Sequence, residues 1–315
     1  MPKPPPTPTV RDFQMPAAGS VEELLSGFRG MGGFSPKALV DAVDVWRQMR
    51  KDGAKVLLSI PAAPFATGLR GVVVQCVTEG LLDGIITTCG TLDHDLARTW
   101  GAYHHGSFQM DDEELAKKGV HRLGSVLVPR SSYGELLERR LGPLLKELFA
   151  TEKHVSTVDF CRYLGQKLEG EKGASQSLLY QAQKRNVPIF VPGPTDGAVG
   201  SQVWQRYQQD RSIRFDLLRD EQRLYEFVHD AKRLGGVILG GGISKHHLIW
   251  WAQFRDGLDY AVAVTTAPEY DGSLSGARLR EAISWGKLKA RARHVTVEGD
   301  LTLILPLIVA GVLQA

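Results

Sequence analysis

Short apolar segments alternate with amphipathic helical patterns along most of the 315 residues of this chain. The apolar segments lie at residues 55–60, 84–88, 125–128, 188–191, 236–239, 260–265 and 294–297. The helical patterns lie at residues 35–50, 69–82, 133–148, 158–168, 221–233 and 246–254, and Ser35 is expected to cap the first of them. Such alternation is typical of a parallel β-sheet with helices on both faces. The sequence therefore predicts an α/β fold of the Rossmann-like kind.

The chain has no internal repeat and no linker that divides it, which favours one domain over two. We expect this domain to cover residues 21–315, and the proline-rich residues 1–20 to form a flexible arm. The apolar run at residues 301–313 contains Pro306 and is shorter than a membrane span, so it predicts a buried helix and no membrane partner.

Composition excludes several classes of protein. Hydrophobic residues make up 43% of the chain and charged residues 23%, as in ordinary soluble domains. The formal net charge is only +3 and no basic block dominates, so nucleic acid is not an expected partner. Cys76, Cys89 and Cys161 have the spacing of neither metal ligands nor a disulfide framework, which indicates a reducing cytoplasm.

Polar or glycine-rich segments follow four of the predicted strands, at residues 87–90, 195–197, 240–242 and from 265 onward. Ligands of open α/β sheets bind at the carboxyl ends of the strands, so these segments predict a binding crevice. The run Gly240-Gly241-Gly242 precedes a helix expected to begin near Ser244, where backbone N–H groups could approach a phosphate. The spaced third glycine of the GxGxxG fingerprint is missing, so a nucleotide site and a simple tight turn both stay open.

One lysine has the neighbours of a nucleophile. In the segment 281–287, Glu281 and Trp285 are four residues apart and Ser284 and Lys287 three apart, so on a helix each pair would share a face. A lysine beside an aromatic side chain can lose hydration, which favours the neutral amine that attacks carbonyl or imine carbon. An exposed lysine at a helix end, with Lys289 close by, is the alternative interpretation.

Three further motifs have structural as well as functional interpretations. His246 and His247 are adjacent, so on a helix they point about 100° apart, and we predict no metal site. Asp93 and Asp95 could cap a helix. Asp196 lies in a turn rich in proline and glycine, where aspartate is common for structural reasons.

These motifs, in this order along the chain, resemble those of the deoxyhypusine synthase family. They are Thr87-Thr88-Cys89-Gly90, Thr195-Asp196-Gly197, Gly240 to His247, the loop Glu269 to Ala277, and Ser284-Trp285-Gly286-Lys287. The resemblance extends from about Gly53 to the C-terminus. It implies NAD as cofactor, spermidine as donor of a 4-aminobutyl group, and a small translation factor as the acceptor. It also implies a homotetramer with sites at subunit interfaces.

The resemblance further implies roles for particular residues. Lys287 would be the nucleophile and His246 a proton relay that also contacts substrate. The implied cofactor contacts are Thr88, Cys89, Gly90, His94, Asp196, Gly241, Thr266, Gly299 and Asp300. The implied substrate contacts are Asp93, His246, Gly272, Ser273, Glu281 and Trp285, with Asp93 and Glu281 as amine anchors and Trp285 as a packing wall.

The chain departs from the eukaryotic members of the family at several places. Asp93 and His94 stand where those members have two glutamates, and Ser201 and Leu274 stand where they have aspartates. Residues 62–66 are apolar where the eukaryotic pattern is polar. Three functions therefore stay open: deoxyhypusine synthesis, the same chemistry with another amine (homospermidine synthesis, or agmatine as donor), and a non-catalytic NAD-binding scaffold.

Overall fold

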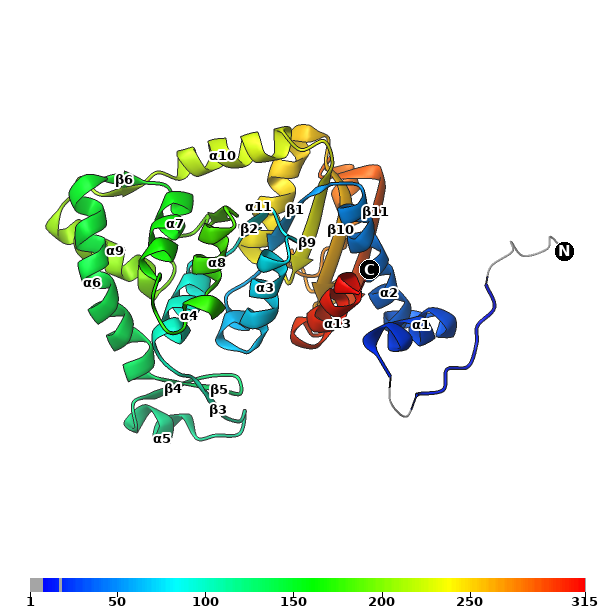
Figure 1. Ribbon diagram of the computed structural model, residues 1–315, viewed down its shortest axis with the longest axis horizontal. Helices are drawn as coiled ribbons and strands as arrows, with labels where there is room; N and C mark the ends of the chain where they lie inside the picture. Colours follow the sequence, from blue (N-terminus) through cyan, green and yellow to red (C-terminus); the bar gives the residue numbers. More distant parts are fainter. Residues whose placement is uncertain (1–7, 17–18, 315) are drawn as a thin grey trace.

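The computed structural model describes residues 8–16 and 19–314, and it is built around a six-stranded sheet (Figure 1). In spatial order the strands are β11 (Leu288–Glu298), β10 (Leu258–Thr265), β9 (Leu234–Leu239), β1 (Lys55–Ser59), β2 (Gly84–Ile86) and β7 (Ile189–Phe190). Every neighbouring pair is parallel. The predicted α/β fold with a parallel central sheet is confirmed.

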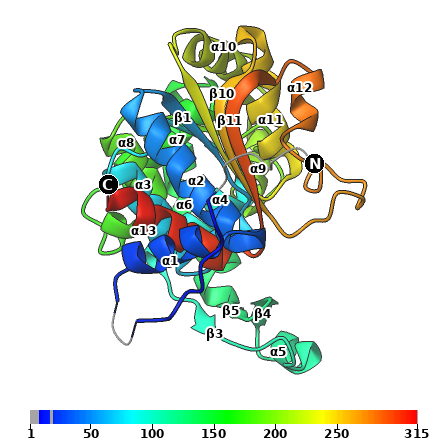
Figure 2. The same cartoon turned by 90° about the vertical axis from the view of Figure 1, so that its right-hand side faces the viewer.

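Each face of the sheet has its own hydrophobic core, because side chains alternate along a strand. In β1, Val56 and Leu58 belong to one core and Leu57 to the other. One face is covered by α2 (Phe34–Lys51), α3 (Leu69–Thr78) and α13 (Leu301–Leu313), and α1 (Val21–Met31) packs outside α2 and α13. The other face is covered by α10 (Leu217–His229), α11 (Gly242–Ala252) and α12 (Glu281–Ser284) (Figure 2).

Five helices pack around the β2–β7 edge of the sheet. They are α4 (Cys89–Trp100), α6 (Gly134–Thr151), α7 (Thr157–Lys167), α8 (Leu178–Lys184) and α9 (Ala198–Gln209), with the short parallel pair β6 (His154–Val155) and β8 (Arg214–Phe215) beside them. Buried aspartates connect these helices. Asp93, Asp95 and Asp220 each accept backbone N–H hydrogen bonds from the first turn of another helix, which is α9, α8 and α7 respectively. Each carboxylate satisfies donors that a helix start leaves free.

One predicted strand does not belong to the central sheet. Residues 125–128 fall in β5 (Val126–Pro129), which pairs antiparallel with β4 (Val120–Leu123) and β3 (His104–His105). With α5 (Asp112–Lys117) they form a projection below the sheet (Figure 1). The two-residue turn Gly124-Ser125, with Gly124 at φ +60°, makes β4 and β5 a hairpin. The prediction of a buried parallel strand is wrong because this hairpin signal decides the pairing.

Several element boundaries differ from expectation. α2 begins at Phe34 after Gly33, which has φ +64°, so Ser35 lies inside the first turn and its side chain is not the cap. α11 begins at Gly242, two residues before the expected Ser244. Short 3-10 turns at Ala63–Ala66, Arg130–Ser132, Ala174–Gln176 and Gln253–Arg255 complete the elements of the described residues.

The described part of the N-terminal arm runs along α1. The N–H of Arg11 donates to the carbonyl oxygen of Gly30, and the ring of Phe13 meets that of Phe28 edge to face at 6.2 Å. The prediction for residues 1–7 and 17–18 lies outside the described residues. Within the described part of the chain, no helix is long and apolar enough to cross a membrane, and the apolar run at 301–313 forms α13.

Candidate active site

Lys287 follows a helix rather than lying on one. α12 ends at Ser284, Gly286 has φ +66°, and Lys287 directly precedes β11. The expected shared helix face of Ser284 and Lys287 is wrong, because a left-handed glycine separates the two residues. The carbonyl oxygen of Lys287 accepts a hydrogen bond from the N–H of Leu258 (3.1 Å), which ties the lysine backbone to the start of β10.

The side chain of Lys287 is buried between aromatic rings. The residue is only 8% exposed, and its Nζ lies 5.2 Å from the ring centroid of Trp285 and 5.5 Å from that of Trp250. It borders a cavity of about 160 Å³. The cavity is lined by Lys245, Ile249, Leu274, Ala277, Arg278, Glu281, Ala282, Trp285 and Lys287. The structure thus brings Lys287, Glu281 and Trp285 together, although Trp285 itself is 66% exposed.

His246 lies near this cavity, on the exposed side of α11. Its imidazole stacks on Trp250, one helical turn later, with ring centroids 5.6 Å apart. Partial burial lowers the pKa of His246, and the positive charge of Lys287 lowers it further. Both effects favour a neutral imidazole at neutral pH, which is the form that can accept a proton.

Lys245 is a member of the cavity wall that sequence reasoning missed. Its Nζ donates to the carbonyl oxygens of Leu274 (2.6 Å) and Ala277 (2.7 Å), so it holds the loop that forms the opposite wall. Burial lowers the pKa of Lys245 to about 8. Its position directly before His246 in the Gly240–His247 motif was the available signal, but the motif alone does not show which side chains turn inward.

A second cavity, of about 340 Å³, lies at the carboxyl edge of β9, β10 and β11. Its lining consists of Gly240, Thr265, Thr266, Ala267, Asp271, Ser273, Ser275, Gly299, Asp300 and Leu301. Gly241 adjoins it, and a Cβ there would lie 2.0 Å from Oγ of Ser275 and 2.6 Å from its Cα. Only glycine fits this close approach, which leaves the start of α11 accessible to a ligand. Asp300 also caps α13, since it accepts from the N–H of Thr302.

One loop separates the two cavities. Ser273 and Ser275 line the second cavity, whereas Leu274, between them, lines the lysine cavity. Gly272, at φ +75°, lies in the same exposed loop. Lys287 and Asp300 flank opposite ends of β11, whose 11 residues span roughly 35 Å at about 3.3 Å per residue. The Lys287 backbone is therefore at the amino edge of the sheet, away from the crevice at the carboxyl edge.

A third group of predicted residues lies farther along the carboxyl edge, after β2 and β7. Cys89 and Gly90 open α4 after Thr88, and burial raises the pKa of the Cys89 thiol to about 12. A Cβ at Gly197 would lie 2.8 Å from Sγ of Cys89, so the turn that holds Asp196 packs directly on this helix start. The strand order reverses between β1 and β9, which places this group and the second cavity on either side of the switch point.

Asp93 is in the interior of this region. It is 1% exposed, and its oxygens accept from the N–H groups of Ala198 and Val199 and from the hydroxyl of Tyr133 (2.9 Å). Burial raises the pKa of Asp93 in spite of these bonds. The structure does not bring Asp93 to the lysine cavity, so its role as an amine anchor stays a prediction that would require these bonds to be exchanged.

His94 lies between two phenol rings. Its Nδ1 is 3.0 Å from the hydroxyl of Tyr103, and its ring is 5.6 Å from that of Tyr133. Burial lowers the pKa of His94 to about 4, so the imidazole is neutral over the physiological range. The two tyrosines were not singled out from the sequence, because nothing local marks them as neighbours of this helix.

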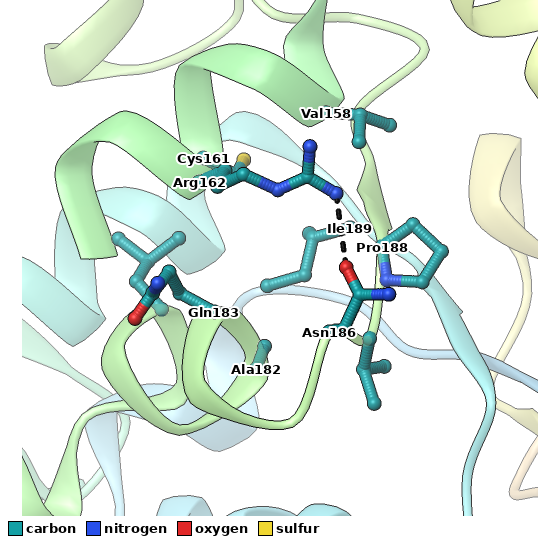
Figure 3. A pocket seen from close by; sticks show the side chains of 10 residues that line it. Val158, Cys161, Arg162, Ala182, Gln183, Asn186, Pro188 and Ile189 are labelled. Atoms are coloured by element: carbon teal, nitrogen blue, oxygen red, sulfur yellow. Dashed lines mark hydrogen bonds between the residues drawn. The ribbon is translucent and has the colours of Figure 1, made fainter. Parts of the chain in front are cut away.

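Further features lie outside both of these cavities. The crevice between α7, α8 and β7, where Nη2 of Arg162 donates to Oδ1 of Asn186 (3.2 Å), has a volume of only about 10 Å³ (Figure 3). That is room for about one water molecule. His247 pairs with Glu221 at 3.3 Å. Across residues 8–16 and 19–314 there is no cluster of three or more histidine, cysteine or acidic side chains that could hold a metal ion.

Comparison with known proteins gives the family. The sequence model of the deoxyhypusine synthase family matches residues 23–312. Relatives curated as probable deoxyhypusine synthases include one from Thermoplasma acidophilum, 48% identical over 301 residues, with 96% of each chain covered. Another, from Ignicoccus hospitalis, is 44% identical over 309 residues, with 96% of this chain and 95% of the relative covered.

Solved structures show the same fold. A crystal structure of an Entamoeba histolytica protein assigned as a deoxyhypusine synthase superposes with a TM-score of 0.70, at 18% identity and 97% coverage of both chains. AgrE, solved with ornithine and NAD+, matches at a TM-score of 0.53 and 14% identity over 88% of this chain and 33% of AgrE. The parallel sheet, its glycine-rich edge and the buried Lys287 define the class of α/β folds with helices on both faces of a parallel sheet. The chain belongs to the deoxyhypusine synthase family and is a transferase.

Proposed function

We propose that the chain transfers the 4-aminobutyl group of spermidine, with NAD as cofactor, to one lysine of the translation factor that carries hypusine. The observation that carries this proposal is Lys287, buried between two indoles at a cavity that Glu281 also lines. This arrangement offers an amine nucleophile and a carboxylate within one small cavity, which aminobutyl transfer through an enzyme imine requires. The three free, buried cysteines support a reducing cytoplasm as its location.

The cofactor proposal rests on the crevice at the carboxyl edge of the sheet. The close approach of Gly241 to Ser275, the exposed start of α11 and the polar lining of the second cavity fit a dinucleotide. Thr266, Gly299 and Asp300 would hold one part of it, and Thr88, Gly90 and Asp196, across the switch point, another. NAD would supply the chemistry that side chains lack, by taking a hydride from the donor amine and returning it at the end.

The residues of the lysine cavity would carry out the group transfer. Neutral Nζ of Lys287 attacks the imine carbon of the oxidised donor, and the C–N bond to the departing diamine breaks, which leaves the aminobutyl group as an imine on Lys287. The acceptor lysine then attacks the same carbon and releases Lys287. Glu281 would hold a cationic amine, and the neutral imidazole of His246 would take and return protons at the attacking and departing nitrogens.

The positions of the two cavities support an assembly in which they meet between chains. In one chain the loop 271–278 separates them, and Lys287 starts at the amino edge of the sheet. We infer that Lys287 of one copy completes the cofactor crevice of another copy, within the homotetramer that the family resemblance implies. A single folded chain would then bind the cofactor but not bring its own lysine to it.

A trapping experiment tests the proposed reaction. The protein is incubated with NAD and spermidine, reduced with borohydride, and its intact mass and peptide masses are measured. We expect an aminobutyl adduct on Lys287 that is absent from Lys287→Ala. The acceptor factor should remove the label when it is added before reduction. Bound NAD without any adduct would favour the non-catalytic scaffold and would refute the assignment of Lys287.

A parallel sample with agmatine tests the second candidate. Ser201 and Leu274 replace acidic residues, and the structure gives them other roles: Oγ of Ser201 donates to the carbonyl oxygen of Gly197, and the Leu274 carbonyl accepts from Lys245. Because fewer carboxylates would surround the donor, an amine substrate other than that of the eukaryotic members is favoured. An adduct formed with agmatine alone would identify a guanidinobutyl transferase, and aminobutylation of putrescine would identify homospermidine synthesis.

A further inference from the structure

Trp250 has the surroundings of a binding residue, although the sequence motifs do not include it. It lies in the last turn of α11 and is 42% exposed. Its ring stacks on that of His246, one turn earlier, with an interplanar angle of 25°, and the ring centroid of Phe254, one turn later, lies 6.2 Å away in a T-shaped arrangement. These two neighbours therefore fix the orientation of an indole that still faces solvent.

Trp250 and Trp285 come from different segments of the chain, and both rings lie close to Nζ of Lys287. Nζ of Lys287 is 5.5 Å from one ring centroid and 5.2 Å from the other, and both distances are within the range of cation–π attraction. In the described part of the chain no carboxylate is paired with this amine, since Glu281 lines the cavity outside ion-pair distance. The positive charge of Lys287 is thus held by two π faces.

We propose that Trp250 and Trp285 form a two-indole slot that binds the alkylammonium group of the amine donor in place of the Lys287 ammonium. The proposal rests on the proposed function. Two cations cannot share the slot without repulsion, so a donor ammonium between the rings favours the neutral form of Lys287, which is the nucleophile. The apolar ring faces also suit the methylene chain of such a donor. Trp250 is accordingly a specificity-determining residue of the donor site.

Two substitutions distinguish the effect of an aromatic ring at position 250 from the effect of side-chain size alone. Trp250→Leu keeps an apolar side chain without a ring, and Trp250→Phe keeps a ring. We expect Trp250→Leu to raise KM for the donor by about 2- to 30-fold, the equivalent of one cation–π contact. Trp250→Phe should recover most of that loss, and KM for NAD should stay unchanged in both. The proposal would be overturned if Trp250→Leu and Trp250→Phe had equal KM values for the donor, or if KM for NAD rose by the same factor.

The control is Trp204→Leu, another exposed indole, on α9 and outside both cavities. It should leave KM for the donor and for NAD at the wild-type values. Circular dichroism checks that each variant folds. If Trp250→Leu does not fold, the comparison of n-butylammonium binding by Lys287→Met and by wild type still decides whether the slot binds the donor ammonium.

Direct binding of n-butylammonium tests the slot without turnover. The probe should quench tryptophan fluorescence as it binds to the wild type. It should bind to Lys287→Met with higher affinity, because the competing ammonium is gone. Trp250→Leu in the Lys287→Met background should lose this gain. A Lys287→Met variant that binds the probe no better than wild type would refute the slot. This readout stays valid if trapping shows no Lys287 adduct, so failure of the slot and failure of the proposed function can be told apart.

Discussion

The imidazole of His94 illustrates how one buried side chain makes stability depend on pH. Its pKa is lowered to about 4 by burial, whereas in an unfolded chain it is about 6.5. Between these values the unfolded chain binds a proton that the folded chain excludes. The free energy of unfolding must therefore fall as the pH falls from about 6.5 to about 4, and this contribution is constant above about 6.5.

We expect His94→Gln to weaken this dependence. Between pH 7 and pH 4 the wild type should lose up to about 3 kcal/mol more unfolding free energy than the variant, as 1.36 kcal/mol per pKa unit implies. Urea denaturation at four pH values measures the difference. The exposed imidazole of His121, on β4, is the matched control, and His121→Gln should follow the wild-type curve. Parallel curves for His94→Gln and wild type would contradict the expected protonation behaviour.

At the residue scale, local motifs predicted which nearby residues share a cavity, but they did not predict the contacts between different elements. Glu281, Trp285 and Lys287 lie within seven residues, so the sequence alone brings them near one another. Trp250 and Lys245 could not be recognised in the same way, because their roles depend on which side of α11 faces the loop and Lys287. Helix periodicity gives the relative directions of side chains on one helix, not the identity of the neighbouring element.

At the scale of elements, Asp95 shows how helices of this layer are joined. It is buried, accepts from the N–H groups of Leu178 and Leu179 at the start of α8, and pairs with Arg70. Asp95→Ala leaves a buried guanidinium without its carboxylate and two N–H groups without acceptors. We expect a loss of about 3–5 kcal/mol in unfolding free energy, measured by urea denaturation at pH 7.

Asp112→Ala provides the comparison for this substitution. Asp112 also pairs with an arginine, Arg122, but its side chain is exposed, so we expect a much smaller loss of unfolding free energy than for Asp95→Ala. A similar, small loss for both variants would show that Asp95 does not hold α8 in place. Loss of far-UV circular dichroism in Asp95→Ala at 25 °C would be the extreme form of the expected result.

Apolar runs predicted the elements of the central sheet, but turn chemistry decided the exceptions. Each of the six parallel strands contains a predicted apolar run or overlaps one, because the part of a parallel strand that is covered on both faces is apolar. The segment 125–128 has the same composition, and only the Gly124-Ser125 turn marks it as part of a hairpin. Likewise, Gly286 ends α12 before Lys287, a signal that residue spacing alone overlooks.

At the scale of the whole molecule, subunit complementation tests whether two chains build each site. Lys287→Ala removes the proposed nucleophile but leaves the second cavity intact. Gly241→Val closes that cavity, because a Cβ at this position already meets Ser275. Each variant alone should be inactive. Co-expressed with equal amounts of each, they should regain roughly a quarter of wild-type activity, since half of the pairs are mixed and each mixed pair has one intact site.

Sites built within one chain would give no recovery in this mixture. Size-exclusion chromatography with differently tagged variants shows whether mixed assemblies form, which is the necessary control. A double variant, Lys287→Ala with Gly241→Val in the same chain, co-expressed with the wild type, separates the two arrangements again. Sites between chains predict that mixed pairs have no intact site, so about a quarter of wild-type activity remains, whereas sites within chains predict that each wild-type chain keeps its own site and about half remains.

The loop 271–278 has one cavity on each side, and the two cavities have no lining residue in common. Substitutions at Trp250, Glu281 or Trp285 therefore alter the surroundings of Lys287 without touching the wall of the other cavity. In evolutionary terms the two specificities are separable. Under the proposed function, a lineage can exchange its amine donor through a few changes around Lys287 while inheriting the cavity proposed for the cofactor unaltered, and the reverse holds as well.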